Sequence, residues 1–257
     1  MRLKSKGIVR YFLELSFDGT DYHGWQRQPN AISVQQQLEE ALSMLLSETV
    51  EVVAAGRTDA GVHAHQLFVH FDTLQELDTQ GLRHRLNRFL PEALVIHEIF
   101  QVQEEAHARF DALSRAYRYR ISTAKDPFST RFAWYFPQPL QLDVMNEAAK
   151  MLLGTHDFEC FSKSNTDVKT YICTIAQAVF EQVGHEIVFT IKADRFLRNM
   201  VRAIVGTLVE VGSGKRDLSS IHSILESKSR SEAGVSVPAK GLSLIAVEYP
   251  ELRLHAR

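Results

Sequence analysis

The order of strand-like and helix-like stretches in the N-terminal part of the chain most constrains its fold. Residues 11–17 alternate apolar with other side chains, as in a strand, and residues 34–46 repeat apolar side chains at helical spacing. Ser33 precedes that helix as an N-cap, with Gln36 at the capping-box position. The complete order is strand 11–17, helix 34–46, strands 51–54 and 66–71, helix 78–90 and strand 94–100. This β-α-β-β-α-β pattern predicts an antiparallel sheet with its helices on one face.

The C-terminal part repeats this order less regularly. Strand-like runs flank Gly184, which predicts a hairpin. The expected elements are strands 115–123, 172–183, 185–192 and 242–249 and helices 143–153, 196–211 and 220–226. Because both parts share one layered pattern, we expect an internal duplication and an α+β fold. It would consist of two ferredoxin-like halves, residues 1–104 and 105–257, with antiparallel sheets side by side around a central cleft.

Composition excludes several classes of protein. The net charge of −2 gives no sign of a polyanionic partner, so an argument for nucleic acid must come from local clusters of charge. Cys160 and Cys173 are too few for a disulfide framework and too far apart for a metal-binding pair. They favour a reducing, cytoplasmic setting with both thiols buried. No stretch has the character of a membrane span or of a secretory signal.

The loop between strands 51–54 and 66–71 carries the most reactive set of side chains. Its Thr-Asp-Ala-Gly sequence would form an ordinary turn, with Asp59 accepting N–H groups and Gly61 at positive φ. A turn does not require Arg57, nor Gly56, which would let a backbone or a ligand approach closely. Because binding and catalytic groups concentrate on loops held by rigid strands, a reactive site is the alternative interpretation.

The helix expected at 196–211 separates apolar from basic residues. Its apolar positions share one side, and Arg195, Arg198 and Arg202 fall on the other at spacings of three and four. Such a stripe is usually a solvated face. Gly206 lies on the same side as the arginines and would admit a close neighbour, so a binding surface is the competing interpretation.

Cations and aromatic rings alternate between residues 109 and 136. This combination grips looped or single-stranded nucleic acid, because charges bind phosphates and rings stack on bases. On a strand, Tyr117 and Tyr119 would share one face and Arg118 and Arg120 the other, so part of the rings belong to the core. The candidates are Arg109, Phe110, Arg115, Tyr117, Arg118, Tyr119, Arg120, Lys125, Phe128, Arg131, Phe132, Trp134 and Tyr135.

Asp59 is the outstanding candidate for a nucleophile. No serine or cysteine occupies a nucleophile elbow, and residues 212–215 lack the spacing of a P-loop. His63 and His65 would share one side of a strand, whereas His70 has the opposite parity. Because a zinc site needs several convergent ligands, no metal is expected. To attack, Asp59 must be ionised, a form that a nearby guanidinium would favour.

Several motifs resemble the signature of the TruA-type tRNA pseudouridine synthases, the pseudouridine synthase I family. The two longest are residues 56–63 (GRTDAGVH) and 22–28 (YHGWQRQ). Further matches are Leu86-Asn87 with Leu90-Pro91, residues 107–112 (HARFDA), 115–119 (RAYRY) and 196–202 (FLRNMVR), Asp157-Phe158 and Gly241-Leu242. The similarity covers nearly the whole chain, and so many matches in one order are highly specific.

The resemblance implies a pseudouridine synthase fold and isomerisation of uridine to pseudouridine in the anticodon stem-loop of tRNA, at positions 38, 39 and 40. It also implies a homodimer that holds one tRNA across both subunits and needs no cofactor. Asp59 would be the nucleophile, Tyr117 the ring against the target base and Arg202 the basic partner of the aspartate. Arg57 would assist base flipping. RNA contacts are expected from Arg57, His107, Arg109, Phe110, Lys125, Arg131 and Arg198.

Some positions depart from the family pattern. They are His65-Gln66-Leu67 where a Gly-Gln pair is common, Cys173 where an arginine is frequent, Ala203 where asparagine is usual, and residues 235–238 (VSVP). None is one of the three implied catalytic residues. Cys173 would remove an RNA contact, so the affinity or the set of modified uridines can differ from the pattern.

Two other functions remain open at this point. A non-catalytic RNA-binding module or folding chaperone would use the same basic cleft without any need for Asp59. A hydrolase using Asp59 and His63 as an acid–base pair would release free uracil or cleave RNA. In either case the chain would bind RNA without forming pseudouridine.

Overall fold

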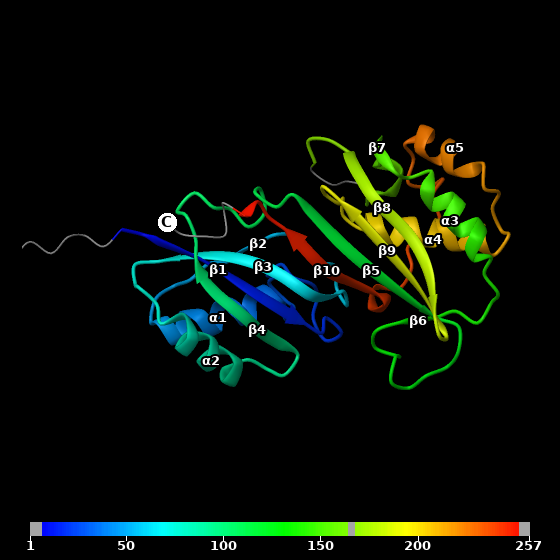
Figure 1. Ribbon diagram of the computed structural model, residues 1–257. Helices are drawn as coiled ribbons and strands as arrows, with labels where there is room; N and C mark the ends of the chain where they lie inside the picture. Colours follow the sequence, from blue (N-terminus) through cyan, green and yellow to red (C-terminus); the bar gives the residue numbers. More distant parts are fainter. Residues whose placement is uncertain (1–6, 164–167, 252–257) are drawn as a thin grey trace, which may run out of the picture. The chain divides into compact units, whose positions relative to one another are not determined.

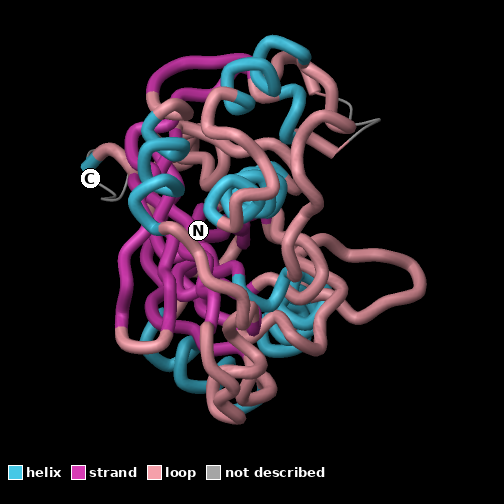
Figure 2. Tube along the Cα trace, turned by 90° about the vertical axis from the view of Figure 1, so that its right-hand side faces the viewer, coloured by secondary structure: helices cyan, strands magenta, loops and turns pink. Residues whose placement is uncertain are grey.

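The computed structural model describes residues 7–163 and 168–251. Contacts divide the chain into two compact units: unit 1 is Met1–Leu113 with Ile245–Arg257, and unit 2 is Ser114–Leu244. Within the described ranges, none of the helices combines the length and the hydropathy needed to cross a bilayer. Helices, strands and loops are distinguished by colour in Figure 2.

Unit 1 has the predicted β-α-β-β-α-β order (Figure 1). Strand β1 lies between β4 and β3 and is antiparallel to both, and β2 pairs antiparallel with β3. Helices α1 and α2 lie on the same face of this sheet (Figure 1). The elements are β1 (Val9–Phe17), α1 (Val34–Leu46), β2 (Val53–Ala54), β3 (His63–Thr73), α2 (Thr79–Phe89), β4 (Leu94–Gln101) and the last part of β10 (Leu242–Glu248), from Ile245 on.

Helix α1 shows how the sequence pattern becomes packing. Its apolar positions, spaced three and four apart, are buried against the sheet, and burying a large aliphatic side chain stabilises by roughly 1.5–3 kcal/mol. Ser33 caps the helix as predicted, with its hydroxyl accepting the Gln36 N–H at 3.2 Å. The side chain of Gln36 donates forward to Glu40 at 2.9 Å. The capping box is therefore half formed.

An asparagine joins a helix to a strand in each unit. In α2, Asn87 donates to the Ile96 carbonyl at 2.8 Å and accepts the Ile96 N–H at 2.7 Å. In α3 (Leu142–Lys150), Asn146 makes the same pair of bonds to Phe180, at 3.0 and 2.7 Å. One side chain thus satisfies both main-chain groups of a strand residue.

Unit 2 is built on strands in the order β10-β5-β9-β8-β7. The predicted hairpin is confirmed, with Gly184 at φ +59° between β8 and β9. Strand β6 runs parallel to β5, so the expectation of purely antiparallel sheets is wrong here. The elements are β5 (Ser114–Ser122), β6 (Trp134–Tyr135), α3, β7 (Gly154–Asp157), β8 (Ile172–Val183), β9 (Glu186–Ala193), α4 (Met200–Gly212), α5 (Ser220–Ser227) and the start of β10, with 3₁₀ turns at Glu159–Phe161 and Ala239–Gly241.

Some element boundaries differ from the sequence expectation. Helix α4 begins at Met200 and not at Phe196, because Asn199 has a left-handed backbone with φ +67° that an α-helix cannot include. Strand β2 has two residues, and β6 and β7 were not predicted. Both units combine helices with strands, so the expected α+β fold class is confirmed.

Candidate active site

The loop of residues 55–62 forms the predicted turn between β2 and β3. Gly61 takes φ +75°, and the Val62 N–H donates to the Asp59 carbonyl at 3.1 Å. The Ala55 N–H donates to the Phe68 carbonyl at 2.8 Å, which fixes the start of the loop to β3. Both ends of the loop are therefore held by main-chain bonds, as a precisely placed side chain requires.

Residues 19–25 hold the middle of this loop. The Trp25 N–H donates to the Thr58 carbonyl, and the Gly61 N–H donates to the Tyr22 carbonyl, each at 3.2 Å. These bonds lie on either side of Asp59 in the sequence. The motif 22–28 noted in the sequence thus positions the main chain of the motif 56–63.

Two glycines allow the close contact between these segments. A Cβ atom at Gly24, which has φ +87°, would lie 2.5 Å from the Thr58 carbonyl oxygen, and one at Gly19 would lie 2.0 Å from that of Val62. At Gly56, where the sequence suggested a close approach, a Cβ atom would meet nothing within 4 Å. The requirement for glycine therefore lies at Gly19 and Gly24 and not at Gly56.

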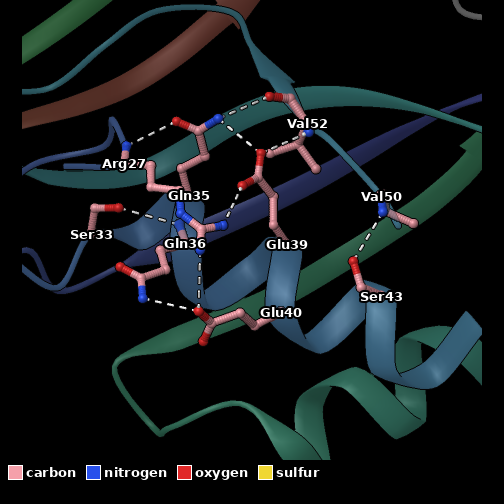
Figure 3. A network of polar contacts seen from close by, with 9 residues as sticks. All are labelled: Arg27, Ser33, Gln35, Gln36, Glu39, Glu40, Ser43, Val50 and Val52. Carbon is pink, nitrogen blue, oxygen red and sulfur yellow. Dashed lines mark hydrogen bonds and ion pairs between the residues drawn. The ribbon is translucent and has the colours of Figure 1, made fainter. Parts of the chain in front are cut away.

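A polar network from α1 holds the segment that leads into β2 and the loop (Figure 3). The buried Glu39 carboxylate accepts the Val52 N–H at 3.1 Å and the Gln35 amide at 2.9 Å. Gln35 in turn accepts the Arg27 N–H at 3.0 Å, and the Arg27 guanidinium lies 3.4 Å from Glu39. Because a buried carboxylate must be hydrogen-bonded, this network links α1 to the segment before β2 and to the segment after Trp25.

The side chains of the loop differ in exposure. Arg57 is exposed, whereas Thr58 and Asp59 are partly buried. Among the residues that the structure describes, the Thr58 hydroxyl is the buried side-chain polar atom that has no hydrogen-bond partner. Leaving such a group unsatisfied costs roughly 1–3 kcal/mol.

In unit 2, Tyr117 lies on β5 opposite Ile191 of β9. Its ring is 9 % exposed and meets Phe196 edge to face, with 5.1 Å between centroids. Tyr119 is fully buried on the same face, whereas Arg118 is exposed, so the predicted division of the two faces is confirmed. Burial raises the pKa of Tyr119, and its hydroxyl donates to the Pro238 carbonyl at 2.8 Å.

The predicted arginine stripe on a helix is wrong. Arg195 and Arg198 precede α4, and only Arg202 belongs to it. Helix α4 is buried on nearly all sides, and the close neighbour at Gly206 is the Val235 carbonyl, 1.8 Å from where a Cβ atom would lie. The Arg202 Nε atom donates to the Val237 carbonyl at 2.8 Å. Arg198 is exposed.

A turn at residues 107–111 gathers three predicted RNA-binding residues. The His107 Nδ1 atom accepts the N–H groups of Arg109 and Phe110, at 3.1 and 3.2 Å. The Arg109 guanidinium lies 5.7 Å from the centre of the Phe110 ring, which is 74 % exposed. Burial, followed by the charge of Arg10, lowers the pKa of His107. The turn thus presents a cation and a ring together.

His70 of β3 anchors this turn to the sheet of unit 1. Its Nδ1 atom accepts the Ala108 N–H at 3.1 Å, and burial with the Arg10 charge lowers the pKa of His70 to about 4. The Tyr249 hydroxyl donates to the Ala108 carbonyl at 2.5 Å. Sequence reasoning considered His70 only as a metal ligand. The signal for its role in holding the turn would have been the basic, aromatic motif at residues 107–112.

The remaining predicted contacts lie between β5 and β6. Lys125 and Arg131 are exposed, and Phe128 between them is 91 % exposed. Exposed aromatic rings beside cations are typical of protein surfaces on which nucleic-acid bases stack.

The other candidate ligands have structural partners. The His63 Nδ1 atom lies 3.0 Å from the Gly19 amide and 3.1 Å from the Asp18 carboxylate. Within residues 7–163 and 168–251, no group of three or more His, Cys, Asp or Glu residues is arranged to hold a metal ion. Cys160 and Cys173 are buried as predicted, which raises the pKa of their thiols to about 12 and about 11.

Comparison with known proteins identifies the family. A family model for tRNA pseudouridine synthase matches residues 15–111 and 148–250. The tRNA pseudouridine synthase A of Parabacteroides distasonis is 50% identical over 243 residues, which cover 94% of this chain and 96% of that protein. The protein of the same name from Bacteroides thetaiotaomicron is 51% identical over 247 residues, covering 95% and 92%. That from Brevibacillus brevis is 42% identical over 237 residues, covering 91% and 97%. The chain therefore belongs to the tRNA pseudouridine synthase family and is an isomerase that acts on tRNA.

Proposed function

We propose that this isomerase converts uridines 38, 39 and 40 of the tRNA anticodon stem-loop to pseudouridine, with Asp59 as the nucleophile. The observation that carries the proposal is the fixed main chain around Asp59. Two hydrogen bonds and two glycine contacts hold this loop to residues 19–25. A reacting group needs such preorganisation, since a misplacement of about 1 Å can cost a factor of about 100 in rate.

The reaction explains why a carboxylate is needed. The C–N glycosidic bond breaks and a C–C bond forms to the same uracil, so the base must be retained and turned while it is detached. A carboxylate at Asp59 can attack the anomeric carbon or assist deprotonation of the sugar, and either route divides the exchange into easier steps. Arg57 would fill or hold open the stack that the flipped nucleotide leaves.

Two residues of unit 2 complete the proposed catalytic set. Tyr117 offers a nearly buried ring, held by Phe196, against which the target base can pack. Arg202 supplies a cation for the aspartate, and its guanidinium is oriented by the Val237 carbonyl. These roles come from the family resemblance. The ring contact of Tyr117 and the hydrogen bond of Arg202, which restrict both side chains, support them.

The exposed cations and rings would bind the RNA. Phosphates attract cations without regard to sequence, and unpaired bases stack on rings. Lys125 and Arg131 flank an exposed ring, and the turn at 107–111 presents another. The proposed contact residues are Arg57, His107, Arg109, Phe110, Lys125, Arg131 and Arg198.

The proposal includes the wider organisation of the molecule. Residues 1–104 would act as a ferredoxin-like half with the catalytic loop, and residues 105–257 as a second half with the basic segments. The strand orders β4-β1-β3-β2 and β10-β5-β9-β8 support this division, because each follows a β-α-β-β-α-β path once the added β6, β7 and α5 of the second half are set aside. The enzyme would act in the cytoplasm as a homodimer.

Site-resolved mapping of pseudouridine in unmodified tRNA transcripts tests the proposal. Asp59→Asn should abolish the product while tRNA affinity stays within about a factor of three, because the amide keeps the shape of the side chain but cannot attack. Asp143→Asn, at the exposed start of α3, is the matched control and should retain activity. Wild-type protein that binds tRNA but forms no pseudouridine would support an RNA-binding module. Release of uracil or cleavage of RNA would support a hydrolase.

Arg202→Leu tests whether Arg202 is a catalytic cation or one that only faces solvent. We expect turnover to fall by about 100-fold or more, because the replacement removes the positive charge. Leucine is an apolar side chain that suits the buried helix α4, so the fold should persist. Unaltered turnover would contradict the proposed role of Arg202.

A further inference from the structure

The segment of residues 233–238 lies directly against helix α4. A Cβ atom at Gly206 would be 1.8 Å from the Val235 carbonyl oxygen, and one at Gly234 would be 2.8 Å from the main chain of Thr207. The Gly234 N–H also donates to the Thr207 hydroxyl at 2.8 Å. Main chain thus meets main chain, a contact that glycine on both sides permits.

The segment is bonded to Arg202 twice. The Arg202 Nε atom donates to the Val237 carbonyl at 2.8 Å, and the Val237 N–H donates to the Arg202 carbonyl at 3.3 Å. A guanidinium is planar, so a bond at Nε sets the plane and the direction of its two terminal nitrogens.

A second layer of contacts holds the segment itself. The Ser236 hydroxyl accepts hydrogen bonds from Asn199 at 2.6 Å and from Arg230 at 2.9 Å. Arg230 also donates to the Gly234 carbonyl at 3.0 Å. One guanidinium and one hydroxyl therefore tie the segment to the start of α4.

The contact with Asn199 explains an unusual helix start. Asn199 occupies the N-cap position with φ +67°, and its side chain makes no capping bond to the helix. Asparagine tolerates this conformation better than most residues, and here its amide reaches Ser236. The left-handed residue ends the preceding loop and lets α4 begin at Met200, two residues before Arg202.

We propose that residues 233–238, held by Ser236 and Arg230, are a positioning device for the Arg202 guanidinium. Ser236 and Arg230 are positioning residues, since they act through Val237. The inference rests on the catalytic role proposed for Arg202 and adds the part of the chain that makes this role possible.

Ser236→Ala tests the device with a change of one oxygen atom. We expect kcat for pseudouridine formation to fall by about 10- to 100-fold while KM changes less than threefold, because tRNA binding does not depend on the direction of one guanidinium. Ser236→Thr keeps the hydroxyl and should restore most of the rate. Ser220→Ala removes a comparable hydroxyl at the start of α5, bonded to the Asp217 carbonyl, and should have no effect.

A double-mutant cycle distinguishes positioning from general destabilisation. Arg202→Lys lacks the Nε donor to Val237, so adding Ser236→Ala to it should lower kcat by less than about twofold. Losses that multiply would overturn the proposal, as would full activity of Ser236→Ala. If Ser236→Ala does not fold, Arg230→Lys serves in its place, because lysine lacks the fork that spans Gly234 and Ser236.

The outcome is separable from that of the proposed function. Wild-type protein without pseudouridine synthase activity on tRNA would overturn the proposed function itself. An active wild type with an inactive Arg202→Leu and an unaffected Ser236→Ala would overturn the positioning device alone.

Discussion

At the scale of single residues, the position of Asp59 depends on two glycines that pack against its loop. Gly19 and Gly24 have no Cβ, and their main chains therefore touch the carbonyls of Val62 and Thr58. Such contacts join segments far apart in the sequence, so they leave no periodic signal. Sequence reasoning could single out the loop of residues 55–62 from its composition but could not name the residues that hold it.

Gly24→Ala should displace the loop of residues 55–62. The added methyl group would lie 2.5 Å from a carbonyl oxygen, and alanine is strained at φ +87°. Overpacking of this kind costs about 1–3 kcal/mol, so we expect a lower midpoint of thermal unfolding together with a large loss of pseudouridine formation. Gly56→Ala is the control for stability, since its methyl group would meet nothing. Equal melting temperatures for the two variants would contradict the contact at Gly24.

The neutral His70 makes stability depend on pH. Its pKa of about 4 in the folded protein lies below the ordinary value of 6.5, so the unfolded chain takes up a proton first as the pH falls. The free energy of unfolding that His70 contributes is complete above pH 6.5 and is lost between pH 6.5 and about 4. Arg10, His107, Asp72 and Asp111 are the charged or titratable groups that act on its pKa.

Urea unfolding at several pH values, compared with His70→Asn, checks this prediction. Asparagine can accept the Ala108 N–H but does not titrate, so the variant should be less stable at pH 7 and lose less stability on acidification. Parallel pH profiles for the two proteins would rule out a contribution from His70.

At the scale of elements, periodicity identified most strands and helices, and it failed where a local bond overrides it. Residues 196–199 continue the apolar pattern of α4, yet Asn199 has a positive φ and ends that continuation. The position of Arg198 on a helix was therefore wrong, whereas that of Arg202 was right. Strand β6 is too short to show alternation, and its pairing with β5 could not be read from the sequence.

Asn87 and Asn146, which join helix to strand, should contribute similarly to the stability of their units. Asn87→Ala and Asn146→Ala each leave both main-chain groups of a strand residue without their partner, at a cost of roughly 1–3 kcal/mol per unsatisfied group that water cannot reach. We expect each variant to lower the thermal midpoint, whereas Asn30→Ala, at an exposed loop position, should not. Midpoints unchanged within error would show that water replaces these bonds.

At the scale of the whole molecule, a small negative net charge coexists with exposed basic segments. The net charge of −2 concealed these segments, and only the spacing of arginines and rings indicated them. Periodicity alone could not tell which of the rings between residues 109 and 136 are exposed, and the structure shows that Phe110 and Phe128 are.

Salt dependence of tRNA binding should reveal which cations contact phosphate. Binding that releases counterions weakens linearly with the logarithm of salt concentration, and removing one phosphate contact lowers the slope by about 1. We expect this change for Lys125→Ala and for Arg131→Ala, measured by filter binding. Lys150→Ala, whose ammonium pairs with Glu147 on α3, should leave the slope unaltered. Equal slopes for all variants would exclude Lys125 and Arg131 from the interface.

The glycine contacts at residues 19 and 24 bear on protein engineering. A graft of residues 55–62 into another scaffold would carry the Asp59 carboxylate but not the main chain of residues 19–25 that holds the loop in place. A working transplant would have to move both stretches as one cassette, with the two glycines unchanged.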